Sequence, residues 1–307
     1  MHLSLVAPVG KGEREVSVSD SNRNTSSTSR PAWLLLFGMP KCGTTSLGAI
    51  LDCSPVLAVH SQKEPNDFIE RCPGGLPKIS GYAATDATQY FVDFSTQYGM
   101  PRHRDRVLEN LCSLGLLPTA KFIVSLREPH ALAKSYFGHL TSRSGLKSKT
   151  DGDEIRDRII GATDFVPVLD TLLAQVESEN VFVVKFEDLL GLEAQTRTSL
   201  ALSNWLDIPA IEFVSVKKSN VASDARRYPV VIEKLAKVVR KADIVRRLPP
   251  NFRRRVSRSL SYRVSNDDTH FELDRWTDGR ILARSAAFYE LLSTGPYDPA
   301  NKLGTIF

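Results

Sequence analysis

Short, mainly apolar runs of residues limit most strongly what this chain can fold into. One run covers residues 33–37 and stops at Gly38, and similar runs cover residues 121–126 and 181–184. Runs of this length without regular polar alternation are typical of strands that are buried on both faces, as in a parallel sheet. We therefore expect these three segments to be core strands of one such sheet.

Segments with helical character lie between these runs. Residues 45–51 are small and aliphatic, with a hydroxyl residue near the start as the expected N-cap. Residues 129–140 begin with a proline, which suits the first turn of a helix, and residues 166–176 are amphipathic. Strands that alternate with helices predict an α/β fold, an open parallel sheet with helices on both faces. Ligands of such sheets bind beyond the carboxyl ends of the strands, where Lys41 and Arg127 follow directly.

The length of 307 residues and the 42% hydrophobic content suit one α/β domain with insertions. Residues 1–30 are rich in Ser, Asn and charge, so we expect a disordered tail there and a single domain over residues 31–307. The apolar start is too short for a signal peptide, and no apolar run reaches the about 20 residues that span a bilayer. We expect a cytoplasmic protein with no membrane span, and the sequence indicates no particular oligomeric state.

The charge and the cysteine content exclude fewer functions than the pattern of strands and helices does. The net charge of +5 suits an anionic ligand without identifying one. The four cysteines lie within the first 112 residues and form no CxxC pair, so we expect a reduced protein and no metal site. Residues 240–263 hold nine Lys and Arg residues and a single acidic residue. This basic stretch is either a solvated helical face or a docking surface for an anionic acceptor or a membrane.

The segment after the first expected strand, residues 38–47, reads GMPKCGTTSL and carries the features of an anion-binding loop. Its small residues let backbone N–H groups converge on an anion, and the following helix adds partial positive charge. A Walker A loop would place lysine directly after a glycine and before Ser or Thr. Here Lys41 comes two residues before Gly43, so its ammonium would approach the bound group from the strand side. We call residues 38–47 the phosphate loop.

The phosphate loop resembles the 5′-phosphosulfate loop of the sulfotransferases that use 3′-phosphoadenosine 5′-phosphosulfate (PAPS), which reads PKxGTTxL. Residues 40–47 fill every fixed position of that pattern. The resemblance implies a P-loop-like sulfotransferase fold, PAPS as the donor, and a catalytic Lys41. It also implies that the donor is bound by Lys41, Cys42, Gly43, Thr44, Thr45 and Ser46.

A second signature of these sulfotransferases is an Arg at a strand end with a Ser eight residues later, and Arg127 and Ser135 are similar to it. The resemblance implies that this pair binds the 3′-phosphate, a task that suits the planar fork of an arginine. Relatives also close a late basic loop over the 3′-phosphate. Arg226 and Arg227 occupy its place in this chain.

The segment Lys63-Glu64-Pro65-Asn66-Asp67-Phe68 resembles the Lys-Glu-Pro-x-x-Phe segment of the Golgi-type carbohydrate sulfotransferases. That resemblance implies that Glu64 is the general base, with Lys63 either orienting Glu64 or the sulfate, or forming an ordinary ion pair. The residues alone leave other bases open as well. These are His60, His103, His130, His139 and further carboxylates.

The acceptor side resembles the family less closely. Residues 92–98, VDFSTQY, are similar to the Asp-x-Ser-Pro-x-Tyr segment near the acceptor, but Thr96 replaces the proline and Phe94 stands where heparan-type members often have Lys. Residues 186–189 resemble the Glu-Asp-Leu element, whose role in relatives is mainly structural. Residues 137–164, with their Ser, Lys and Gly content, are interpreted as a variable loop that binds the acceptor.

Three functions remain after this comparison. The first is in-line transfer of a sulfuryl group from PAPS to the hydroxyl of a carbohydrate or small-molecule acceptor, without a metal. The second is a nucleotide-dependent kinase that places ATP in the same loop, which the Lys-Gly order and the pair Arg127 and Ser135 argue against. The third is a non-catalytic module that binds nucleic acid or acidic lipid through the basic stretch. The chain lacks interleaved aromatic residues and nucleic-acid motifs, so we expect no nucleic-acid partner.

Overall fold

The computed structural model describes residues 30–69, 79–142, 144, 146–147, 150–212, 226–227, 262–263 and 271–293. The chain divides into two units, Met1–Arg30 and Pro31–Phe307, and the description that follows concerns the second. The expected tail over residues 1–30 lies outside the described residues except for Arg30, as does nearly all of the basic stretch.

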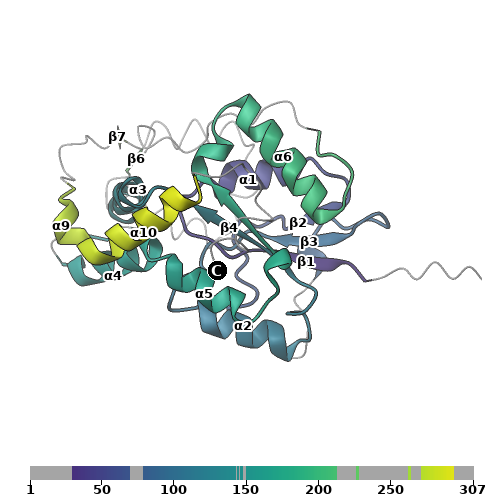
Figure 1. Cartoon of the computed structure of the whole chain (residues 1–307), viewed down its shortest axis with the longest axis horizontal. Coiled ribbons are helices and arrows are strands. Elements are labelled where there is room, and N and C mark those ends of the chain that lie inside the picture. The colour runs from purple at the N-terminus through teal and green to yellow at the C-terminus, as the bar shows by residue number, and fades with distance from the viewer. Residues whose placement is uncertain are drawn as a thin grey trace, which may run out of the picture. The chain divides into compact units, whose positions relative to one another are not determined.

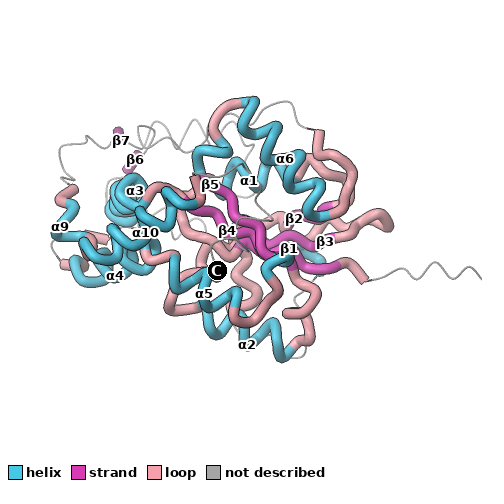
Figure 2. The backbone as a smooth tube through the Cα atoms, in the orientation of Figure 1, coloured by secondary structure: helices cyan, strands magenta, loops and turns pink. Residues whose placement is uncertain are grey.

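A sheet of five parallel strands forms the centre of the described residues, in the order β2-β3-β1-β4-β5 (Figure 2). Its strands are β1 (Ala32–Leu36), β2 (Leu57–Val59), β3 (Tyr90–Asp93), β4 (Lys121–Leu126) and β5 (Val181–Lys185). In the middle of the sheet, Leu34 of β1 lies in register with Val92 on one side and Lys121 on the other. The three predicted core strands are confirmed. β2 and β3 were not predicted, because three or four residues are too few for a clear pattern.

Helices cover both faces of the sheet, so the predicted α/β fold is confirmed (Figure 1). The longer helices are α1 (Thr44–Leu51), α2 (Arg104–Ser113), α3 (Pro129–Ser142), α4 (Gly152–Thr163), α5 (Val166–Leu173), α6 (Leu192–Leu206) and α10 (Gly279–Leu291). The short elements are η1 (Ile79–Gly81), η2 (Ser178–Asn180), η3 (Phe186–Leu189) and α9 (Leu273–Trp276).

The two faces of β1 belong to two separate parts of the core. Leu34 and Leu36 pack in one cluster with residues of α1 and α6. Trp33 and Leu35 point the other way, into a larger cluster with residues of α2, α3 and α5. Successive side chains of a strand point to opposite faces, so a strand between two layers must be apolar at every position. This explains why the pattern of residues 33–37 identifies a central strand.

The order of the strands places a switch point beside β1. The chain builds β2 and β3 on one side of β1 and then crosses to build β4 and β5 on the other. Connections therefore leave β1 and β4 toward opposite sides, and the carboxyl ends of these two strands form the crevice in which open α/β sheets bind ligands. The phosphate loop follows β1 and Arg127 follows β4.

The interpretation of residues 137–164 as a variable loop is wrong. α3 continues to Ser142, and α4 occupies Gly152–Thr163. The reason lies in Ile155, Ile159 and Ala162, which are fully buried and spaced four and three residues apart. That spacing puts them on one face of a helix, which packs against α3. Most of this segment is therefore helical, and the described residues between α3 and α4 form the connection between the two helices.

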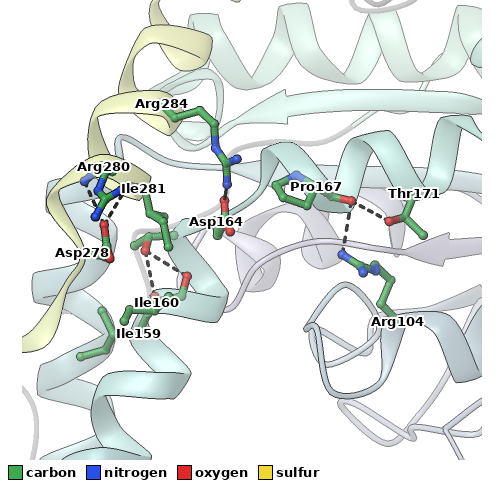
Figure 3. Close-up of polar contacts among 11 residues, drawn as sticks. Arg104, Ile159, Ile160, Asp164, Pro167, Thr171, Asp278, Arg280, Ile281 and Arg284 are labelled. Atoms are coloured by element: carbon green, nitrogen blue, oxygen red, sulfur yellow. Dashed lines mark hydrogen bonds and ion pairs between the residues drawn. The ribbon is translucent and has the colours of Figure 1, made fainter.

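Polar contacts join the helices on this side of the sheet (Figure 3). Asp278 caps α10 by accepting hydrogen bonds from the backbone N–H groups of Arg280 and Ile281, at 2.9 and 3.3 Å. Arg284 of α10 forms an ion pair with Asp164, which follows α4. Arg104 donates to the carbonyl of Pro167 at 3.2 Å and so ties α2 to α5. None of the described helices has the length and apolar character needed to cross a membrane.

Candidate active site

The exit of β1 lies tightly against β4. Hydrogen bonds continue past the end of the strand, from the Phe37 N–H to the Ile123 carbonyl at 2.8 Å and from the Met39 N–H to the Ser125 carbonyl at 3.3 Å. A Cβ atom on Gly38 would lie 2.6 Å from the backbone nitrogen of Ser125, closer than real Cβ atoms come. Only glycine fits at this position. The phosphate loop therefore starts directly beside the end of β4.

The phosphate loop turns through two residues with positive φ, Lys41 at 69° and Gly43 at 83°. The N–H groups of Ser46 and Leu47 donate to the Gly43 carbonyl at 2.9 and 3.0 Å, so α1 begins just after Gly43. The expected hydroxyl N-cap is wrong, because Gly43 takes that position. The chain must turn in the left-handed region before the helix, which glycine does without strain. The N-terminus of α1, which carries the positive end of the helix dipole, therefore follows the phosphate loop.

The side chain of Cys42 lies in the hydrophobic core beneath the phosphate loop. It is fully buried, and its thiol donates to the Pro40 carbonyl at 3.7 Å. Burial raises the pKa of the Cys42 thiol, which the charge of Arg127 opposes without cancelling. The thiol therefore stays neutral. Only the backbone of Cys42 can take part in binding an anion.

Arg127 connects the end of β4 to the phosphate loop. Its Nη1 donates to the Lys41 carbonyl at 3.4 Å, and its guanidinium carbon lies 4.2 Å from the centroid of the Phe186 ring. Its Nε is buried and has no hydrogen-bond partner among the described residues. A buried guanidinium donor without an acceptor is rare in folded proteins and calls for an explanation. The structure thus brings Lys41 and Arg127 together at one place.

Ser135 lies in the second turn of α3, and its side chain is partly buried. The start of α3 is held by Glu128, whose carboxylate accepts hydrogen bonds from the N–H groups of His130 and Ala131 at 2.9 and 2.7 Å. Burial alone would raise the pKa of Glu128, but these hydrogen bonds outweigh it and lower the pKa. The carboxylate therefore stays charged and fixes the helix directly after Arg127. The role of Ser135 stays a prediction.

The segment with Lys63 and Glu64 docks on the phosphate loop. Lys63 Nζ donates to Thr45 Oγ1 at 3.1 Å, and within the part of the chain described it forms no ion pair with Glu64. Glu64 is partly buried and has a φ of 58°. We call residues 63–68 the Glu64 loop. The contact to Thr45 joins two segments that lie 18 residues apart.

Tyr136 of α3 belongs to the same region, which the sequence did not indicate. Burial raises the pKa of its phenol, the charge of Glu64 adds to this, and the charges of Arg158 and Arg102 oppose it. Glu64 therefore lies within electrostatic reach of Tyr136 on α3. The predicted helix over residues 129–140 includes Tyr136, whereas its closeness to Glu64 depends on the tertiary structure.

Arg226 and Arg227 form a two-residue strand, β6 (Arg226–Arg227), that pairs antiparallel with β7 (Tyr262–Arg263). The last two residues of the basic stretch are thus extended rather than helical. That Arg226 and Arg227 bind the 3′-phosphate stays a prediction. Among the described residues, no three His, Cys, Asp or Glu side chains are grouped as metal ligands, and Cys42, Cys53 and Cys112 are free thiols.

No protein-family model matches the chain, and no curated protein sequence matches it. The solved structures that are similar to it include two sulfotransferases. One is a sulfotransferase from Alicyclobacillus acidocaldarius, 17% identical with a TM-score of 0.45, covering 71% of this chain and 94% of that one. The other is the sulfotransferase domain of the olefin synthase from Synechococcus PCC 7002, 14% identical with a TM-score of 0.45, covering 85% and 94%. At these identities the likeness concerns the path of the chain and not the residues of the site.

Proposed function

We propose that this protein is a sulfotransferase that moves a sulfuryl group from PAPS to the hydroxyl of a carbohydrate or small-molecule acceptor. The observation that carries the proposal is the hydrogen bond from Arg127 Nη1 to the carbonyl oxygen of Lys41. It joins the end of β4 to the phosphate loop after β1, so two cationic residues from different strands serve one crevice. A ligand with two separate anionic groups can use both residues at once, and PAPS has such groups in its 5′-phosphosulfate and 3′-phosphate.

The residues present fit this donor. Arg127 Nε is buried without a partner among the described residues, which suits a phosphate oxygen. Gly43 lets the loop pack closely against η3, since a Cβ there would lie 2.7 Å from Leu189 Cδ1. The residues that would hold the donor are Lys41, Cys42, Gly43, Thr44, Thr45, Ser46, Arg127, Ser135, Arg226 and Arg227.

Each residue of the site has a distinct task in the proposed reaction. When bound, PAPS supplies an activated sulfuryl group. Lys41 stabilises the negative charge that develops on the leaving phosphate oxygen. Glu64, held beside the phosphate loop by the Glu64 loop, accepts the proton of the acceptor hydroxyl. The phenol of Tyr136 is neutral near neutral pH and burial raises its pKa further, so it can donate a hydrogen bond to the acceptor.

Nucleotide selectivity tests the proposal. We expect the protein to bind 3′-phosphoadenosine 5′-phosphate (PAP) about tenfold or more tightly than ADP, because a hydrogen bond to a charged group contributes about 1.5–3 kcal/mol. ADP lacks the 3′-phosphate and carries a second phosphate on the 5′ side, so a preference for PAP that is lost with Arg127 reports on the 3′-phosphate. Calorimetric titration of PAP, ADP and ATP gives the three Kd values.

Arg127→Met should remove most of the preference for PAP over ADP. Arg197→Met is the matched control, since it deletes a guanidinium in an exposed i,i+4 pair with Glu193 on α6. That variant should keep the preference of the wild type. Tighter binding of ATP than of PAP would favour the kinase and contradict the proposal.

A further inference from the structure

Asp93, the last residue of β3, is a fully buried carboxylate. It lies opposite Leu35 of the central strand. A buried carboxylate is costly unless hydrogen bonds or ion pairs satisfy it. Among the described residues Asp93 forms no ion pair, and both of its oxygens instead accept hydrogen bonds from hydroxyls. Ser95 Oγ donates to one and Tyr98 Oη to the other, each at 2.5 Å.

The two hydroxyls connect Asp93 to the backbone of the Glu64 loop through hydrogen bonds. Ser95 Oγ accepts the backbone N–H of Asn66 at 2.8 Å, and Tyr98 Oη accepts the backbone N–H of Phe68 at 3.2 Å. A carboxylate can only accept, so it makes each hydroxyl donate toward β3 and present its lone pairs to the loop. Two chains of the form carboxylate, hydroxyl, backbone amide result, and each bond in such a chain strengthens the next.

The Glu64 loop needs such support because its backbone is strained. Glu64 and Asn66 both have positive φ values, 58° and 59°. This left-handed conformation costs a residue with a Cβ about 1–2 kcal/mol, less for asparagine. Asn66 Nδ2 donates to the Glu64 carbonyl at 3.0 Å, which steadies the turn internally. A turn of this kind persists only where surrounding groups hold it.

The other end of the loop is anchored as well. Phe68 is fully buried, and its ring lies 5.0 Å from that of Trp33 and 6.0 Å from that of Tyr98. Asn110 of α2 donates to the Phe68 carbonyl at 3.0 Å. Lys63, at the start of the loop, reaches Thr45 of the phosphate loop. One end of the loop is thus held by the core, and the other contacts the proposed donor site.

We propose that Asp93, Ser95 and Tyr98 are positioning residues that hold the backbone of the Glu64 loop, so that Lys63 and Glu64 lie against the phosphate loop. They act through the loop and touch neither donor nor acceptor. The catalytic part of this inference rests on the proposed function. The structural part, that this relay orders the loop, does not.

Amide hydrogen exchange measured by NMR tests the structural part. In Ser95→Ala the Asn66 amide should exchange about tenfold faster than in the wild type, and in Tyr98→Phe the Phe68 amide should do so, since each loses its acceptor. Tyr90→Phe is the matched control. It removes another phenol, also from the segment around β3, that donates to the Leu206 carbonyl at 3.2 Å. It should leave both amides unchanged. Unaltered exchange in both relay variants would overturn the proposal.

Steady-state kinetics test the catalytic part. Ser95→Ala and Tyr98→Phe should lower kcat about tenfold and leave the Kd of PAP unchanged, whereas Tyr90→Phe should change neither. A purely structural loss would lower kcat and weaken the binding of PAP together, or lower only the melting temperature. If the relay variants speed amide exchange but keep the kcat of the wild type, the loop is ordered without serving catalysis and the positioning role is refuted. A wild type that binds PAP no better than ADP would instead count against the proposed function, while the exchange data still decide whether the relay holds the loop.

Discussion

Most of the described non-glycine residues with a strained backbone belong to the candidate site. Four non-glycine residues of the described part have positive φ, and Lys41, Glu64 and Asn66 are three of them. Strain of this kind costs folding energy and is retained where it aims a side chain or a carbonyl. At Lys41 it turns the carbonyl toward Arg127 Nη1. Both segments that carry the proposed catalytic groups therefore contain residues with a strained backbone.

Substitutions of Lys41 and of Glu64 should impair different parts of the proposed reaction. Lys41→Ala deletes the charge that stabilises the leaving group, and we expect a loss of kcat of about 100-fold to 1,000-fold. Glu64→Gln deletes the proton acceptor and should lower kcat about 100-fold or more while PAP still binds. Both variants should keep the melting temperature close to that of the wild type. Turnover of a hydroxyl acceptor gives kcat. Calorimetric titration gives the Kd of PAP, and a thermal melt gives the melting temperature.

Glu193→Gln is the control for Glu64→Gln, because Glu193 is an exposed residue of α6 that pairs only with Arg197 in the described structure. It should have the turnover of the wild type. Full activity in Glu64→Gln would place the base elsewhere. His103 would be the next candidate, since burial lowers the pKa of its imidazole and keeps it neutral, with the charges of Arg102 and Arg106 acting in the same direction.

At the scale of elements, the start of α1 depends on Gly43. Gly43→Ala would place a Cβ 2.7 Å from Leu189 Cδ1 and 3.1 Å from the Phe186 ring, at a φ of 83°. We expect a loss of unfolding free energy of about 1–2 kcal/mol from the left-handed conformation. Because η3 must shift to make room, Phe186 moves against Arg127, and the affinity for PAP should fall as well.

Gly115→Ala separates these two effects. Gly115 also has a positive φ, 66°, but a Cβ there would meet nothing within 4 Å. It should lose a similar amount of unfolding free energy, about 1–2 kcal/mol, and keep its affinity for PAP. Denaturant unfolding and calorimetric titration of both variants measure the two quantities. Equal PAP affinity in both variants would show that the contact between Gly43 and η3 does not shape the donor site.

At the scale of the whole molecule, Asp93 should make stability depend on pH. Burial raises the pKa of Asp93 from 3.8 to about 6, although hydrogen bonds from Ser95 and Tyr98 lower it in part, and the nearby charges of Asp67 and His60 act weakly in opposite directions. Between these two pH values the folded protein binds the proton that the unfolded chain has released. The unfolding free energy therefore falls as the pH rises from about 4 to about 6, by up to about 3 kcal/mol, and then levels off.

Asp93→Asn removes this titration. The unfolding free energy of the wild type minus that of Asp93→Asn should decrease across the same pH window and stay constant above it. Denaturant unfolding at several pH values from 4 to 8 gives the two curves. Parallel curves would mean that Asp93 has the same pKa in the folded and unfolded chain, which contradicts the prediction.

The sequence by itself determined the central strands and the phosphate loop. Residues 33–37 must be apolar on both faces to lie between two layers of helices, and this local pattern is visible without knowing any neighbour. The small residues after Lys41 are likewise a local requirement of a tight turn before a helix. The helix at residues 129–140 follows from its proline start. Such features depend on residues that are close along the chain.

Only the tertiary structure decided which of these features meet. That β4 pairs with β1, so that Arg127 reaches the Lys41 carbonyl, depends on strand order, which no local pattern encodes. The same holds for Lys63 with Thr45, 18 residues apart. The Asp93 relay was read only as a partial match near the acceptor, because its hydrogen bonds run to backbone amides some 30 residues earlier. Backbone amides are the same at every residue, so a contact to them leaves no mark in the sequence.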